Sequence, residues 1–212
     1  ATRASGAASA SATTLAARYY LATTLYKDGD IAGSEPYFRS LMEQQIALNG
    51  ESHPEALTAM GALALVLQRI DRVDEAVELH ERTIDGTVAY YGDEHPYTMT
   101  SRVNYALILL DQQRFEDARP TFESVLEIRL RTLPAGHYHI GVTRSLYARC
   151  LAGRGEFEAA AEQATQAFDL LLENRGPEHR YTQIARSICA NVYTAWGKPE
   201  MAAEYAPLSS DG

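Results

Sequence analysis

Apolar residues recur along the chain at three- and four-residue steps, and this spacing predicts amphipathic helices. Leu63, Ala64 and Leu67, for example, fall at positions i, i+1 and i+4, so that they share one face of a helix. Comparable faces follow one another along most of the chain, separated by short polar turns, and no alternation typical of a strand interrupts them. The pattern therefore predicts an all-α fold.

The helical pattern repeats with a period of 42 residues, most clearly in a histidine column at His53, His95, His137 and His179. Two alanine columns and one column of large apolar residues keep the same interval: Ala22, Ala64, Ala106, Ala148 and Ala190; Ala76, Ala118, Ala160 and Ala202; Leu25, Leu67, Leu109, Leu151 and Tyr193. Four columns in phase indicate a repeat protein, in which each repeat is one supersecondary unit stacked on its neighbours.

Each period predicts two helices, A and B, joined by a tight turn. The turns are expected at Gly29-Asp30, Asp71-Arg72, Gln113-Arg114, Gly155-Glu156 and Gly197-Lys198. Glycine in three of these five turns is typical of a helix C-terminus. A link of the form Gly-x-x-His-Pro, at 50–54 and 92–96, then closes the period, and its proline suits the first turn of the next helix A.

These features together resemble a known family. The alanine of helix A, the Glu75-Ala76 pair after the turn, Phe38 and Phe122 in helix B, and the Gly-x-x-His-Pro link are similar to tetratricopeptide repeats of the 42-residue kinesin-light-chain type, which many bacterial proteins contain. The resemblance covers about residues 15 to 207. It implies a right-handed superhelical solenoid of about five antiparallel helix pairs that acts as a protein-protein interaction module.

The expected organisation is a flexible tail or linker over residues 1–13, a solenoid over 14–207 and a short tail over 208–212. The five repeats are expected at about 14–50, 51–92, 93–134, 135–176 and 177–207. Residues 1–13 are small and polar and have no apolar face. Arrays of this type often follow bacterial kinase or regulator domains, so the resemblance also implies a regulatory or sensor appendage as an alternative function.

Composition narrows the class of partner. The 212 residues carry a formal net charge of -9, which argues against nucleic acid because binding to phosphates rests on clustered Lys and Arg. No apolar run approaches the roughly 20 residues of a membrane helix and no secretory leader is present, so we expect no membrane partner and a cytoplasmic location. Cys150 and Cys189 are expected to be free core thiols in a reducing compartment.

The histidine column and a column of arginines could suggest chemistry, but a structural role is predicted for both. The four histidines are expected to shape the links, because equivalent residues of successive repeats lie too far apart to share one metal ion. An arginine column, Arg18, Arg102, Arg144 and Arg186, points toward the packed face, and an acidic column in helix B, Glu43, Asp85, Glu127 and Asp169, is its expected ion-pair partner. The alternative is that the arginines bind a ligand.

The outward face of helix A is the predicted binding surface, because helix A lines the concave side of such a solenoid. The residues expected to bind a peptide or partner segment in this helix-A groove are Tyr19, Tyr20, Thr23, Tyr26, Leu65, Arg69, Asn104, Leu107, Leu110, Arg149 and Asn191. The three leucines form the expected apolar patch, which commonly marks a binding site. Asn104, Arg149 and Asn191 are the expected hydrogen-bond donors. A second copy of the chain, giving a homodimer, is the alternative occupant.

Catalysis is not expected, and neither a metal nor a cofactor is predicted. The chain has no nucleophile elbow, phosphate-binding Gly loop or His-Glu-x-x-His motif. His80 and His139 fall outside the histidine column. His80 takes the helix-B position that is Phe38 and Phe122 in neighbouring repeats, so packing explains it better than chemistry. The predicted partner is a protein or peptide.

Overall fold

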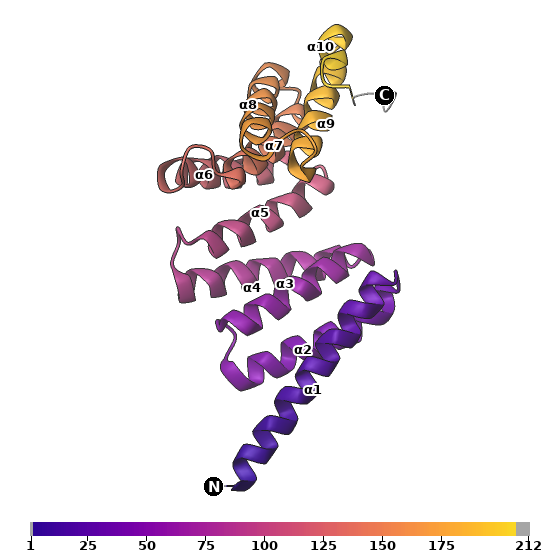
Figure 1. Cartoon of the computed structure of the whole chain (residues 1–212), viewed down its shortest axis with the longest axis vertical. Helices are drawn as coiled ribbons and strands as arrows, with labels where there is room; N and C mark the ends of the chain where they lie inside the picture. Colours follow the sequence, from indigo (N-terminus) through magenta and orange to yellow (C-terminus); the bar gives the residue numbers. More distant parts are fainter. Residues whose placement is uncertain (1, 207–212) are drawn as a thin grey trace. The chain divides into compact units, whose positions relative to one another are not determined.

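The computed structural model describes residues 2–206, with side chains described from residue 15 onward. These residues form ten α-helices and, over 2–206, no strand (Figure 1). The predicted all-α class is confirmed. The helices are α1 (Thr2–Lys27), α2 (Ile31–Asn49), α3 (Pro54–Arg69), α4 (Val73–Tyr91), α5 (Pro96–Asp111), α6 (Phe115–Thr132), α7 (Tyr138–Gly153), α8 (Phe157–Arg175), α9 (Arg180–Ala195) and α10 (Pro199–Ala203). The tail expected over 208–212 lies outside the described residues.

The helices begin at the predicted 42-residue interval. Helix A of the second to fifth repeats begins at Pro54, Pro96, Tyr138 and Arg180. Helix B of the five repeats begins at Ile31, Val73, Phe115, Phe157 and Pro199. Proline at positions 54 and 96 opens α3 and α5, where its missing N–H costs no intrahelical hydrogen bond. The repeat period is thus a period of the backbone as well as of the sequence.

The turn between helix A and helix B requires a left-handed residue in every repeat. Gly29, Gly155 and Gly197 have φ of 90°, 80° and 74°. Asp71 and Gln113 occupy the same turn position with φ of 63° and 59°, although they carry side chains. Glycine tolerates this region without a steric penalty, which explains its presence in three of the five turns.

The histidine column caps helix A. The Nδ1 atoms of His53, His95, His137 and His179 accept hydrogen bonds from the backbone N–H two residues later, at 3.4, 3.2, 3.3 and 3.2 Å. A side-chain acceptor at this position satisfies one of the free N–H groups at the start of a helix. The column therefore structures the links, as predicted. Among residues 15–206, no group of three His, Cys, Asp or Glu side chains could hold a metal ion.

The chain divides into two units, one ending at Tyr105 and one beginning at Ala106. In the N-terminal unit, α2 packs between α1 and α3, and α3 also packs on α4. The core face of α3 includes Met60, Leu63 and Leu67, all fully buried. In the C-terminal unit, α7 packs on α6, α8 and α9, and α10 packs on α9. Small residues such as Ala148, Ala160 and Ala164 lie in this second core and allow close helix approach.

The first helix begins earlier than expected. The sequence predicted a tail or linker over residues 1–13, whereas the backbone of residues 2–13 is helical and continuous with the first repeat helix. Alanine, the residue with the highest helix propensity, recurs through this segment. None of the helices within residues 2–206 is both long and apolar enough to span a membrane.

Candidate functional site

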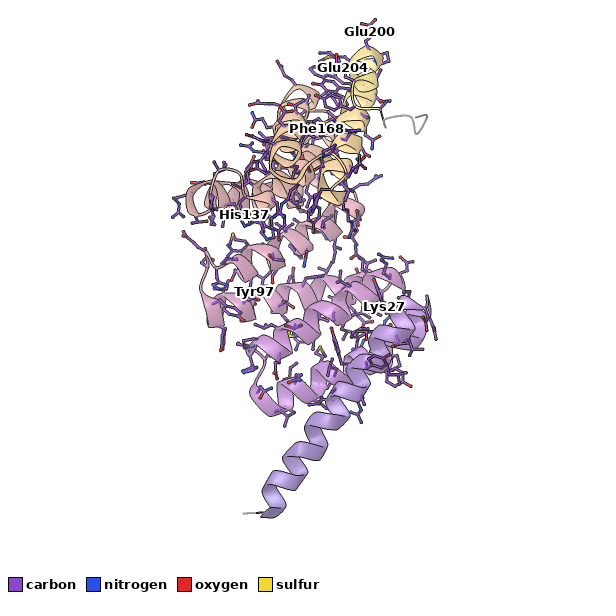
Figure 2. All side chains as sticks on the ribbon, in the orientation of Figure 1. Lys27, Tyr97, His137, Phe168, Glu200 and Glu204 are labelled. Atoms are coloured by element: carbon purple, nitrogen blue, oxygen red, sulfur yellow. The ribbon has the colours of Figure 1, made fainter. Side chains whose placement is uncertain are left out.

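The N-terminal unit contains a cavity of about 560 Å³, which we call the His80 cavity. All five helices of the unit contribute to it. Its lining comprises Leu15, Ala16, Tyr19, Leu41, Gln45, Pro54, Glu55, Leu57, Thr58, Ala59, Gly61, Ala62, His80, Thr83, Thr87, Tyr91, Tyr97, Thr100, Ser101 and Asn104. Figure 2 labels Tyr97 at the start of α5. Because α2 and α4 take part, the cavity extends beyond the helix-A face that the sequence singled out.

Two of the predicted binding residues, Tyr19 and Asn104, line the His80 cavity. The remaining predicted residues of this unit lie outside its lining: Tyr20, Thr23, Tyr26, Leu65 and Arg69. Tyr20 and Leu65 are 74% and 48% exposed. The Thr23 hydroxyl donates back to the carbonyl oxygens of Tyr19 and Tyr20, 2.9 Å away in each case, so it serves its own helix.

His80, for which the sequence predicts a packing role, also lines the cavity. Its side chain is 1% exposed, and no hydrogen-bond partner for its Nε2 atom exists among residues 15–206. Burial lowers the pKa of His80 to about 4, so the imidazole is neutral near pH 7. The signal in the sequence was a histidine at a position that is phenylalanine one repeat earlier, at Phe38, and one repeat later, at Phe122.

The C-terminal unit contains a second concavity of about 760 Å³, here named the α7/α9 groove. Its described lining comes from two helices, both of type A, which pack on one another. The lining residues are Leu146, Arg149, Ala152, Gly153, Arg180, Gln183, Ile184, Ser187, Ile188, Asn191, Val192 and Ala195. The structure thus brings the predicted residues Arg149 and Asn191 to one groove.

The α7/α9 groove combines positive charge with exposed apolar surface. Its charged lining residues are Arg149 and Arg180. Arg149 Nη2 lies 3.3 Å from Asp111 Oδ1, and both side chains of that pair remain substantially exposed. Ile184 is an exposed apolar residue of the same lining. Such a groove can take an apolar side chain and donate hydrogen bonds to carbonyl or carboxylate oxygens.

The leucine patch differs from expectation in α5. Leu65 is exposed as predicted, but Leu107 is half-buried and Leu110 is only 4% exposed. Ile108, Leu109 and Leu110 are all buried. Three consecutive buried residues span about 200° of a helix, so α5 is buried over more of its circumference than one core stripe would cover. The expectation that Leu110 faces outward is therefore wrong.

The arginine column has other partners than those predicted. The observed partners are Ser40 Oγ for Arg18, Asp93 for Arg102, Gln163 Oε1 for Arg144, and the ring of Phe168, labelled on α8 in Figure 2, for Arg186. This corrects the pairing with helix-B acids such as Asp85 and Asp169. A half-buried guanidinium loses less solvation when neutral oxygens or an aromatic face contact it and water still reaches its edge.

The two cysteines are buried and free, as the sequence predicted. Burial raises the pKa of Cys150 to about 11 and that of Cys189 to about 12. Both therefore remain thiols near neutral pH, whereas the reactive form of cysteine is the thiolate. Packing accounts for both side chains.

The paired helices, the left-handed turns and the capped links define a helical-repeat protein. The chain belongs to the tetratricopeptide repeat family, whose model matches residues 13–87, 62–131 and 97–173. No curated protein matches the sequence.

Several solved structures share the fold. The crystal structure of TPR-like repeats described as kinesin light chain, from Podosopora anserina, is 22% identical in sequence, covers 91% of each chain and has a TM-score of 0.77. BtubC (BKLC) from P. vanneervenii is 18% identical over 89% of this chain and 75% of its own, with a TM-score of 0.73. A Rap protein complexed with Competence and Sporulation Factor is also 18% identical, over 89% of this chain and 50% of its own, with a TM-score of 0.71.

Proposed function

We propose that this protein is an interaction module that binds an extended segment of a partner protein on its helix-A surface, with the α7/α9 groove as the principal contact. The observation that carries the proposal is the composition of that groove. Every described lining residue comes from helix A of two consecutive repeats, and Arg149 and Asn191, which the repeat pattern places on the outward face of helix A, are among them. The function is binding rather than reaction.

The chemistry of the groove suits a peptide backbone. The guanidinium groups of Arg149 and Arg180 and the amides of Gln183 and Asn191 are donors that can meet main-chain carbonyls or carboxylates. Ile184, at the groove surface, offers a contact for an apolar side chain. Binding sites typically combine an apolar surface with a few hydrogen-bond donors, and these donors fix the orientation of the ligand.

The structural neighbours favour the same class of function. One Rap protein of this fold is complexed with Competence and Sporulation Factor, so helical-repeat chains of this geometry accept a separate factor as ligand. Because the sequence identity is 18%, the likeness supports the general class of function and not a particular ligand.

The test is selection from a displayed library of extended peptides, followed by affinity measurement on the selected sequences. We expect Arg149→Ala/Asn191→Ala to weaken binding at least tenfold with little change in melting temperature, because both side chains are exposed. Arg114→Ala is a matched control, because Arg114 is likewise an exposed arginine with one acidic partner, Asp117. Equal binding by the double variant and the wild type would refute the assignment.

A second copy of the chain is the competing occupant of the helix-A surface, for which the exposed side chains of Tyr19, Tyr20 and Leu65 provide apolar area. Light scattering coupled to size exclusion, over a concentration series, separates the two cases. A monomer at all concentrations supports a partner segment, and a stable dimer supports self-association. We place this binding in the cytoplasm, in keeping with the two free cysteines.

A further inference from the structure

His80 presents an unusual polar atom in a position that is phenylalanine in the repeats on either side. The equivalent residues one repeat before and one repeat after are Phe38 and Phe122, which are 5% and 0% exposed. His80 is equally buried, and its Nε2 atom has no partner among residues 15–206. An unpaired buried polar group destabilises the folded chain, a cost that phenylalanine avoids at the same place. Packing alone therefore does not explain a histidine here.

The cavity next to this imidazole is nearly uncharged. Glu55 is the charged member of its described lining, and the carboxylate of Glu55 accepts a hydrogen bond from Asn49 Nδ2 at 3.2 Å. The α7/α9 groove, in contrast, carries two arginines. A chain in which 22% of residues are charged has thus left this cavity with almost no charge of either sign. An anionic ligand would lose its hydration without gaining a counter-charge, and the described lining offers a cation only the Glu55 carboxylate.

The size and lining of the cavity suit a small organic molecule. Its volume of about 560 Å³ falls within the roughly 300 to 1,000 Å³ of small-molecule sites. The rings of Tyr19, Tyr91 and Tyr97 lie along it, and they can contact another ring edge to face. The hydroxyls of Thr83 and Thr87 donate to Leu79 O at 2.7 Å and Ile84 O at 2.9 Å, so both threonines already have acceptors in their own helix.

We infer that the His80 cavity binds a small, uncharged aromatic molecule that carries a hydroxyl group, with this hydroxyl hydrogen-bonded to His80 Nε2 after the side chains that cover this atom move aside. A neutral imidazole nitrogen is either a donor or an acceptor, depending on the tautomer. A hydroxyl group can meet both cases, whereas an amine cation can only donate, a carboxylate can only accept, and either would bring a charge into the cavity. The site is separate from the α7/α9 groove and does not depend on the proposed peptide binding.

Three related probes isolate the hydroxyl group and the charge. p-Cresol carries an aromatic ring and a hydroxyl, toluene has the same ring with its methyl but no hydroxyl, and 4-hydroxybenzoate adds a carboxylate. Binding to the full chain is followed by nuclear magnetic resonance, with the imidazole nitrogen signals of His80 as the reporter. We expect p-cresol to bind about tenfold more tightly than toluene, the ratio for one good buried hydrogen bond, and 4-hydroxybenzoate to bind more weakly than p-cresol.

The matched variant is His80→Phe, which installs the residue found at the equivalent positions 38 and 122. We expect this variant to remain folded, to bind toluene and to lose the preference for p-cresol. Equal affinity of the wild type for p-cresol and toluene would overturn the inference, as would a p-cresol preference that persists in the variant. If His80→Phe does not fold, the wild-type Nε2 signal decides: a shift on addition of p-cresol but not of toluene supports the site, and an unmoved signal refutes it.

Failure of the probes to bind at His80 can be told apart from failure of the peptide to bind in the α7/α9 groove. Peptide binding is tested through Arg149 and Asn191 in the C-terminal unit, and the probes are tested through His80 in the N-terminal unit. A selected peptide that displaces p-cresol and shifts His80 Nε2 would show that a partner side chain occupies the cavity, and it would replace the small molecule as the ligand.

Discussion

The phenol of Tyr147 donates a 2.7 Å hydrogen bond to Glu123 Oε1, which joins helix A and helix B of different repeats. The same contact occurs one period earlier, where Tyr105 donates to Glu81 Oε1 at 3.0 Å. Each tyrosine lies 24 residues after its glutamate. The 42-residue period therefore extends from the backbone to a specific side-chain contact.

Removing this hydroxyl has a predictable cost. Burial and the adjacent Glu123 raise the pKa of Tyr147 to about 12, so the phenol remains a donor across the physiological range. We expect Tyr147→Phe to lower the free energy of unfolding by about 1 kcal/mol, because Glu123 keeps Arg119 as a partner. Chemical denaturation measures the change. The control is Tyr20→Phe, at an exposed side chain, where less than about 0.5 kcal/mol is expected.

Acid should destabilise the N-terminal unit through His80. Its pKa is about 4 in the folded chain and about 6.5 in the unfolded chain, so only the unfolded chain binds the proton between these values. The contribution of His80 to the free energy of unfolding is nearly constant above pH 6.5 and falls as the pH falls toward 4. The total loss from this one group is about 3 kcal/mol, and about 2 kcal/mol of it has occurred at pH 5.

His80→Phe separates this contribution from those of other histidines. Urea unfolding of the wild type and of the variant at pH 7 and pH 5 gives four free energies. The decrease from pH 7 to pH 5 is expected to be about 2 kcal/mol smaller in the variant. Identical decreases in the two proteins would show that His80 is protonated equally in the folded and unfolded chains.

The left-handed turns offer a stabilising substitution. Asp71 and Gln113 have φ near 60°, a region that costs an ordinary side chain about 1 kcal/mol relative to glycine. Asp71→Gly is expected to raise the melting temperature slightly, with a gain of at most about 0.5 kcal/mol after the greater flexibility of glycine in the unfolded chain is subtracted. The reverse change, Gly155→Ala at φ 80°, is expected to lower it. A loss of stability in Asp71→Gly would mean that the aspartate side chain stabilises the turn.

Two helical glycines respond differently to the same substitution. A Cβ at position 61 of α3 meets no atom within 4 Å, whereas a Cβ at position 141 of α7 lies 2.7 Å from Leu171 Cγ. Gly61→Ala is expected to stabilise by up to about 1 kcal/mol through helix propensity. Gly141→Ala is expected to destabilise by about 1 to 3 kcal/mol because it forces α7 away from α8. Thermal denaturation of both variants provides the comparison, and a stabilised Gly141→Ala would show that Leu171 moves aside freely.

The repeat framework was predictable because it depends on local chemistry. Proline at positions 54 and 96, glycine at 29, 155 and 197, and the histidine caps each act within a few residues, and the structure places them where the pattern predicted. The apolar columns define the core face for the same reason. Such features need no knowledge of distant contacts.

The partners of long side chains were not predictable in the same way. Arg102 contacts Asp93 in the link nine residues earlier, because a flexible guanidinium reaches acceptors in several directions. The repeat pattern also does not indicate that α2 and α4 line the His80 cavity, because it singles out only the helix-A face. Only His80 signalled the cavity, as a histidine between Phe38 and Phe122 in its column.

The order of packing has a kinetic consequence. Within each unit, the helices that pack together are consecutive in the chain, apart from α7 and α9, which have only α8 between them. No such contact requires the closure of a long loop, so any helix pair can form first and its neighbours can add to it quickly. Opening can proceed by the same route, one pair at a time. The α7/α9 groove can thus remain assembled while helices of the other unit have already opened.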